Sequence, residues 1–113
     1  MFKAIGKLFE SKEEPKEQAI LIRLDGVNLD DSVYAECDTM TLEDQLKEAL
    51  GGEGEVDGSE TGETETTVFL YGSDAEKMFT KIKPVLASYP LYKNARIVIR
   101  HGQPGSPQRE IQL

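Results

Sequence analysis

The chain has 113 residues, 38% of them hydrophobic and 30% charged, which is typical of one globular domain and not of a disordered chain. Its formal net charge of −8 argues against nonspecific DNA binding, because such binding relies on Lys and Arg to neutralise phosphates. A single cysteine, Cys37, excludes an internal disulfide, and no apolar run approaches the roughly 20 residues that span a bilayer.

We expect a tail and linker over residues 1–18, followed by one α+β domain over 19–113. Four large apolar residues between Phe2 and Phe9 lie at near-helical spacing among lysines, as in a short basic amphipathic helix. The segment has neither the apolar stretch nor the cleavage site of a secretory signal. With the single thiol, this predicts a cytoplasmic protein. A tail packed on the domain and a tail that touches a partner or a membrane are both compatible with the pattern, and a membrane anchor is the less favoured of these.

The first half of the domain predicts a strand and then a helix. Residues 19–24 are short, rich in branched apolar side chains and stopped by an Asp-Gly pair, which indicates a strand. Residues 25–40 form an acidic connection, in which 33–37 alternate as in an extended segment. Thr41 is the expected N-cap of a helix that two glycines end after Leu50.

The second half predicts a hairpin, a helix and two further strands. A capping box from Ser73 to Glu76 begins the helix, and Pro84 should kink or end it near Lys83, because proline lacks an N–H and clashes with the preceding turn. The segments in order are strands over 53–60 and 64–71, the helix from Ser73, a loop over 88–94, a strand over 95–100 and an edge strand over 109–113.

This order of elements predicts a ferredoxin-like split β-α-β sandwich, in which two helices cover one face of an antiparallel sheet. The expected strand order is 4-1-3-2, with the extra C-terminal strand beside strand 4. Alternation along the strands then places Ile20, Ile22, Leu24, Val68, Leu70, Ile97 and Ile99 toward the helices. The opposite face carries Leu21, Arg23, Thr67, Phe69, Tyr71, Arg96, Val98 and Arg100.

Charge is polarised along the chain. Residues 25–65 contain fourteen acids and one base, whereas 66–113 contain seven bases and three acids. The first functional hypothesis is therefore a protein-interaction or inhibitory module that docks an acidic surface on a basic protein partner. The residues expected to form this acidic patch are Asp30, Asp31, Glu55, Asp57, Glu60 and Glu63.

Two alternatives stay open. One is a ligand- or RNA-binding sheet face, because arginines interleaved with aromatic residues suit single-stranded RNA. Its residues are Arg23, Phe69, Tyr71, Arg96 and Arg100. The other is a structural homo-oligomer, such as a homodimer, that pairs through the apolar sheet face or the 109–113 edge. The same face could instead be covered by the tail, by residues 25–40 or by a second subunit.

Catalysis, metals and cofactors are not predicted. The loop from Asp25 to Asp31 departs from the calcium-loop spacing of the EF-hand, so an ordinary solvated turn is the favoured interpretation. His101 is the only histidine, which excludes a His pair for zinc, and nothing marks a third group to orient it toward Cys37. The hairpin carboxylates lack the burial that would raise their pKa values for acid-base work. We therefore expect no enzyme.

Overall fold

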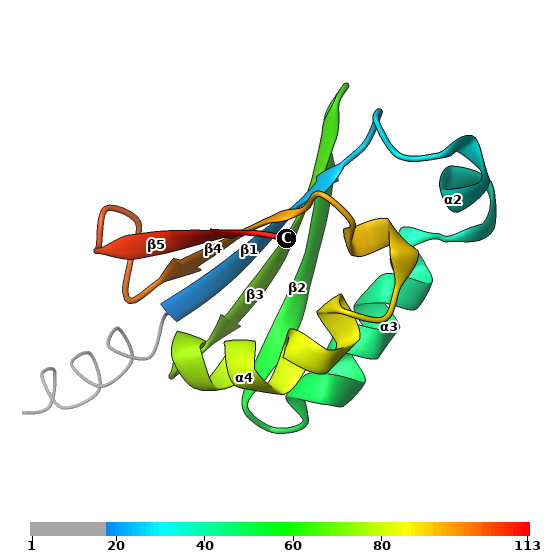
Figure 1. Ribbon diagram of the computed structural model, residues 1–113. Helices are drawn as coiled ribbons and strands as arrows, with labels where there is room; N and C mark the ends of the chain where they lie inside the picture. The colour runs from blue at the N-terminus through cyan, green and yellow to red at the C-terminus, as the bar shows by residue number, and fades with distance from the viewer. Residues whose placement is uncertain (1–17) are drawn as a thin grey trace, which may run out of the picture.

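The computed structural model describes residues 18–113, and these form an α+β fold with a five-stranded antiparallel sheet and three helices (Figure 1). The expected tail and amphipathic helix fall on residues 1–17, which lie outside the described residues, and the first strand begins at Gln18, one residue earlier than expected. Within the described part of the chain, no helix has the length and apolarity needed to cross a membrane.

The sheet has the order β2-β3-β1-β4-β5, and every neighbouring pair is antiparallel. The first strand is therefore central, and the last strand lies at an edge beside β4, as the order of elements in the sequence predicted. The elements are β1 (Gln18–Asp25), α2 (Asp31–Glu36), α3 (Thr39–Leu50), β2 (Gly54–Thr61), β3 (Glu65–Gly72), α4 (Ala75–Leu86), the 3-10 helix η2 (Pro90–Tyr92), β4 (Arg96–Arg100) and β5 (Gln108–Gln112).

The core lies between the sheet and the helices α3 and α4. All seven strand residues that alternation placed toward the helices are at most 3% exposed, which confirms the predicted face. The helices meet them with side chains spaced four residues apart, the spacing of one helix face. These are Leu42, Leu46 and Leu50 of α3, and Met78, Ile82 and Leu86 of α4.

The helix α2 was not predicted, and the expectation of an extended segment over 33–37 is wrong. Val33, Tyr34 and Cys37 pack against the core, and their spacing is that of a helix face, whereas Ala35 is exposed. The Tyr34 hydroxyl fixes this turn, because it donates to the carbonyl of Asp25 at 2.9 Å and accepts from the N–H of Leu29 at 3.0 Å. These contacts to the loop after β1 could not be read from alternation.

Both long helices begin with an aspartate cap. Asp38 accepts a hydrogen bond from the N–H of Thr41 at 2.7 Å, and Asp74 accepts one from the N–H of Lys77 at 3.1 Å. The expected caps, Thr41 and Ser73, are thus wrong by three residues and one residue. A carboxylate oxygen accepts a hydrogen bond from the same backbone N–H groups as a Ser or Thr hydroxyl, and its charge also interacts favourably with the helix N-terminus.

Pro84 does not end α4, which continues to Leu86. The proline lies in the last turn, where it removes one intrahelical hydrogen bond, and the helix end is closed by a bond from the N–H of Ala87 to the carbonyl of Lys83 at 3.2 Å. Burial of Leu86, which is 6% exposed, favours completing the turn.

Candidate functional site

A bulge in the edge strand β2 decides where its carboxylates lie. Glu55 is opposite Tyr71, and Glu60 is opposite Thr67, with an irregularity between them that leaves Asp57 without a partner in β3. Opposite residues in an antiparallel pair share a face, so Glu55 and Glu60 both point away from the helices. Strict alternation would have placed Glu60 on the helix face, and the extra residue reverses this.

We call the side of the sheet away from α3 and α4 the open face. In the described part of the chain, α3 and α4 cover the other face (Figure 1). All three helices contribute side chains to the core there. The open face has an apolar centre, in which Leu21, Phe69 and Tyr71 are half-buried and Val98 is 5% exposed. These four residues lie outside the core cluster. The carboxylates of β2 border this apolar centre on one side.

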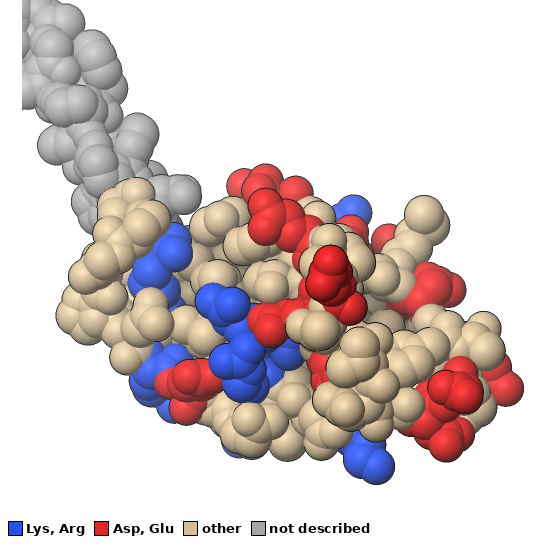
Figure 2. All heavy atoms as spheres, turned by 90° about the horizontal axis from the view of Figure 1, so that it is seen from above, with Lys and Arg blue, Asp and Glu red and all other residues tan. Residues whose placement is uncertain are grey.

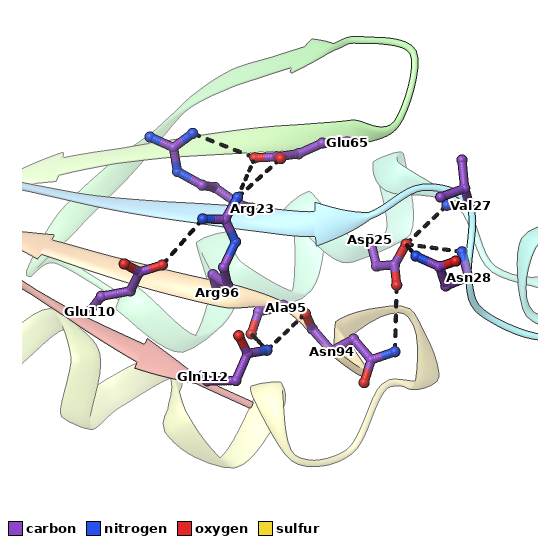
Figure 3. A network of polar contacts seen from close by, with 10 residues as sticks. All are labelled: Arg23, Asp25, Val27, Asn28, Glu65, Asn94, Ala95, Arg96, Glu110 and Gln112. Carbon is purple, nitrogen blue, oxygen red and sulfur yellow. Dashed lines mark hydrogen bonds and ion pairs between the residues drawn. The ribbon is translucent and has the colours of Figure 1, made fainter.

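Two arginines of the open face, Arg23 of β1 and Arg96 of β4, lie opposite each other and are held in ion pairs (Figure 3). Arg23 lies 3.4 Å from Glu65, and Arg96 lies 3.1 Å from the same carboxylate. Arg96 also contacts Glu110 at 3.3 Å. The third arginine, Arg100, donates through Nε to the carbonyl of Gly102 at 2.8 Å. Carboxylates therefore offset the positive charge of Arg23 and Arg96, whereas Arg100 is bonded to a neutral carbonyl and keeps its charge.

The six residues of the predicted acidic patch fall into two groups. Glu55, Asp57 and Glu60 on β2 and Glu63 in the following turn are exposed, and no Lys, Arg or His nitrogen of residues 18–113 lies within 4.0 Å of their carboxylates. Asp30 and Asp31 are exposed at the start of α2, where Asp30 accepts from the hydroxyl of Ser32 at 2.6 Å.

Seen from above, most of the acids gather on the side of the molecule that carries α2 and the β2–β3 turn, and most bases gather on the β4–β5 side (Figure 2). The charge distribution in the sequence also predicts that hairpin acids lie near the lysines of α4. Among the described residues only one such ion pair forms, between Lys77 and Glu53 at 3.5 Å. Within residues 18–113, the acids of β2 are therefore left without a counter-charge.

The loop that faintly resembled a calcium site is held by its own first carboxylate. Asp25 accepts hydrogen bonds from the N–H groups of Val27 and Asn28 at 3.0 and 2.9 Å, and it also contacts the side chain of Asn94 at 3.4 Å (Figure 3). The two backbone bonds lower the pKa of Asp25 below its usual value. This is an Asx turn, in which the side chain substitutes for a backbone acceptor.

The histidine and the cysteine are not brought together. His101 follows β4 and lies 2.7 Å from Glu76, which also binds Arg109 through two hydrogen bonds of 2.6 and 2.9 Å. The hydrogen bonds from Arg109 and then from His101 hold the pKa of Glu76 at about 2. Cys37 follows α2 and packs against the core near Tyr89. Within residues 18–113, no group of three or more His, Cys, Asp or Glu residues is arranged to hold a metal.

Sequence reasoning missed a groove of about 840 Å³ between α4, η2 and β5. Its apolar lining includes Phe79, Leu86, Tyr89, Tyr92, Ile111 and Leu113, and its basic residues are Lys83, Lys93 and Arg109. Tyr92 is 1% exposed and its hydroxyl has no hydrogen-bond partner in residues 18–113, and burial raises its pKa well above the usual range. The only signal in the sequence was the alternation of Arg109, Ile111 and Leu113.

No family model, no curated protein and no solved structure matches the chain. Two surfaces of the described residues are candidates for function, the open face with its acidic border and the basic, apolar groove beside β5.

Proposed function

We propose that the protein is a non-catalytic protein-interaction module, which binds a basic protein through the open face and its acidic border on β2. The observation that carries the proposal is the pairing of Glu55 with Tyr71 and of Glu60 with Thr67 across the bulge. It joins two features that the sequence suggested separately, an acidic patch and an aromatic sheet face, into one surface.

The composition of this surface supports a protein partner. Protein interfaces commonly combine an aromatic and apolar centre with a polar rim. Here the centre is formed by residues such as Phe69 and Tyr71, and the rim by Glu55, Asp57 and Glu60. Since these carboxylates lack cations from residues 18–113, their charge is free to attract a basic partner and to raise its association rate. An RNA ligand is less well supported, because Glu65 and Glu110 together offset the charges of Arg23 and Arg96.

We also propose a ferredoxin-like fold and a cytoplasmic location. The central β1, the antiparallel sheet and the helices α3 and α4 before β2 and after β3 support a ferredoxin-like split β-α-β arrangement, extended by β5. A cytoplasmic setting agrees with the single, half-buried thiol of Cys37. Fold alone carries no function, so the interaction proposal depends only on the open face.

The test compares two triple variants with equal net charge. The first, E55Q/D57N/E60Q, removes three negative charges from the border of the open face. The second, E43Q/D44N/E48Q, removes three from α3, on the other side of the sheet. Both are used as full-length baits in native lysate at about 50 mM and about 500 mM salt, because screening distinguishes electrostatic from apolar binding.

We expect wild type and the α3 variant to retain the same bound proteins at low salt. The β2 variant should lose them by about tenfold or more, equivalent to about 1.4 kcal/mol of binding free energy. High salt should weaken binding by wild type. Equal binding by the two variants, with thermal unfolding showing both folded, would contradict the proposal, and so would binding that does not respond to salt.

A further inference from the structure

The outer edge of β5 presents backbone groups that residues 18–113 leave unpaired. In the ladder between β4 and β5, Leu113 N–H donates to Ala95 O at 2.9 Å, and His101 N–H donates to Pro107 O at 3.0 Å. These two bonds show which opposite residues of the two strands form hydrogen-bonded pairs. Bonded and non-bonded pairs alternate in an antiparallel ladder. Gln108, Glu110 and Gln112 therefore direct their N–H and C=O groups away from β4. This is the outer edge of the sheet, where β5 is the last strand (Figure 1).

The groove lies directly beside this edge, on the helix side of the sheet. Five strands are wider than the two helices α3 and α4 can cover, so the helix-facing side chains of β5 remain partly open. Ile111 is half-buried and Leu113 is 42% exposed. The opposite wall is formed by Phe79 of α4 and by Tyr89 before η2. A groove that runs between a helix and a free strand edge suits an extended peptide, which adds a strand and inserts every second side chain.

The charge of the groove selects the kind of peptide. Its lining contains three basic side chains and no acidic side chain, in a protein whose net charge is −8. Arg109 is engaged with Glu76, but Lys83 and Lys93 are exposed and have no carboxylate of residues 18–113 within 4.0 Å. Ammonium groups that lack a carboxylate partner in residues 18–113, beside an apolar groove, complement a segment that carries both apolar and acidic residues.

We propose that the groove binds an extended, acidic segment of a partner protein, which pairs antiparallel with β5 as a sixth strand. Its groove-facing side chains are apolar against Phe79 and Ile111, and acidic where the segment passes Lys83 and Lys93. This site is separate from the open face and does not depend on the function proposed for it. A protein with both sites would join a basic partner to an acidic one.

A second copy of the chain fits this edge less well. Two β5 strands that pair antiparallel with the fullest overlap place Glu110 opposite Glu110 of the other copy, and like charges directly opposite each other are unfavourable. The same arrangement would bring two sets of Lys83 and Lys93 toward one another. A foreign acidic strand avoids both repulsions.

The test uses three synthetic peptides and the full-length, ¹⁵N-labelled protein. The first is acetyl-Asp-Thr-Val-Thr-Leu-Thr-Asp-amide, which presents Asp, Val, Leu and Asp on one side of a strand. The second replaces both Asp residues with Lys. The third keeps the acidic sequence but carries N-methyl groups on the Thr nitrogens, which in the proposed antiparallel register donate to β5. Binding is followed from the amide signals of Gln108, Glu110 and Gln112.

We expect the acidic peptide to bind with a dissociation constant of about 1 mM or below, at least about tenfold tighter than the lysine peptide. N-methylation should abolish its binding. K83E/K93E should reverse the preference between the first two peptides, whereas K81E, at an exposed site of α4 outside the groove lining, should not.

Three results would overturn the proposal. The acidic peptide could fail to bind at about 5 mM, which is well above the expected constant. The N-methylated peptide could bind equally well, which would indicate side-chain contacts without strand addition. Finally, light scattering could show a dimer that the I111K substitution dissociates, which would make a second copy the occupant. None of these results bears on the E55Q/D57N/E60Q comparison, so the two proposals fail separately.

Discussion

Replacing Glu65 with glutamine should destabilise the fold by about 1 kcal/mol, because it removes the charge that Arg23 and Arg96 share. Arg23 lies 3.4 Å from this carboxylate, and Arg96 reaches both of its oxygens, at 3.1 and 3.2 Å. The Glu65 side chain is 31% exposed and the arginines 37% and 43%, so solvent screens both pairs. Exposed pairs contribute about 0.2–1 kcal/mol each, and Arg96 keeps Glu110 in the variant.

Urea unfolding measures this loss. With a slope of about 1–2 kcal/mol per M, a loss of about 1 kcal/mol moves the midpoint by about 0.5–1 M. The matched control is E63Q, because Glu63 is exposed in the β2–β3 turn and has no cation of residues 18–113 within 4.0 Å. The difference between E65Q and E63Q should shrink at about 1 M salt, where the Debye length is about 3 Å. Equal midpoints for the two variants at low salt, or a difference that salt leaves unchanged, would refute the electrostatic interpretation.

Three further outcomes are expected. The Arg109 and His101 contacts depress the pKa of Glu76 to about 2 from the usual 4.5. Wild type should therefore be more stable than E76Q above about pH 4.5, and thermal melts should show this advantage vanish as the pH falls toward 2. Y92F should leave the thermal midpoint unchanged or raise it, because the buried hydroxyl of Tyr92 has no partner in residues 18–113. G58A should lower the free energy of unfolding in urea by about 1–3 kcal/mol, because Gly58 has φ of +134°, where a side chain is strained.

The parts of the fold that follow a regular period could be predicted from the sequence. Residues such as Ile20 and Ile22 alternate with Leu21 and Arg23 along a regular strand, so a two-residue period assigns both faces without knowledge of the neighbours. The same period failed in α2. There, contacts of Tyr34 with the loop after β1 favour a helix, and such contacts between separate segments leave no periodic signal.

The candidate site was predictable in composition and not in arrangement. The acids of β2 and the aromatics of β3 are visible in the sequence, but strict alternation does not place Glu60 beside Thr67, because the bulge shifts the register. A glycine inside a strand segment, Gly58, was the available signal. The groove left a weaker signal in the sequence, because Phe79, Tyr89 and Ile111 come from three separate elements and meet only in the folded structure.

The two edges of the sheet are built differently, and this difference bears on both proposals. An edge strand invites pairing with another chain unless charges or a bulge oppose it. β2 has both, because the bulge interrupts its ladder and its carboxylates have no counter-charge in residues 18–113. β5 is regular over Gln108–Gln112 and has an apolar groove beside it. The features that make β2 an electrostatic docking surface thus oppose strand addition there, and leave β5 as the edge that can accept a strand.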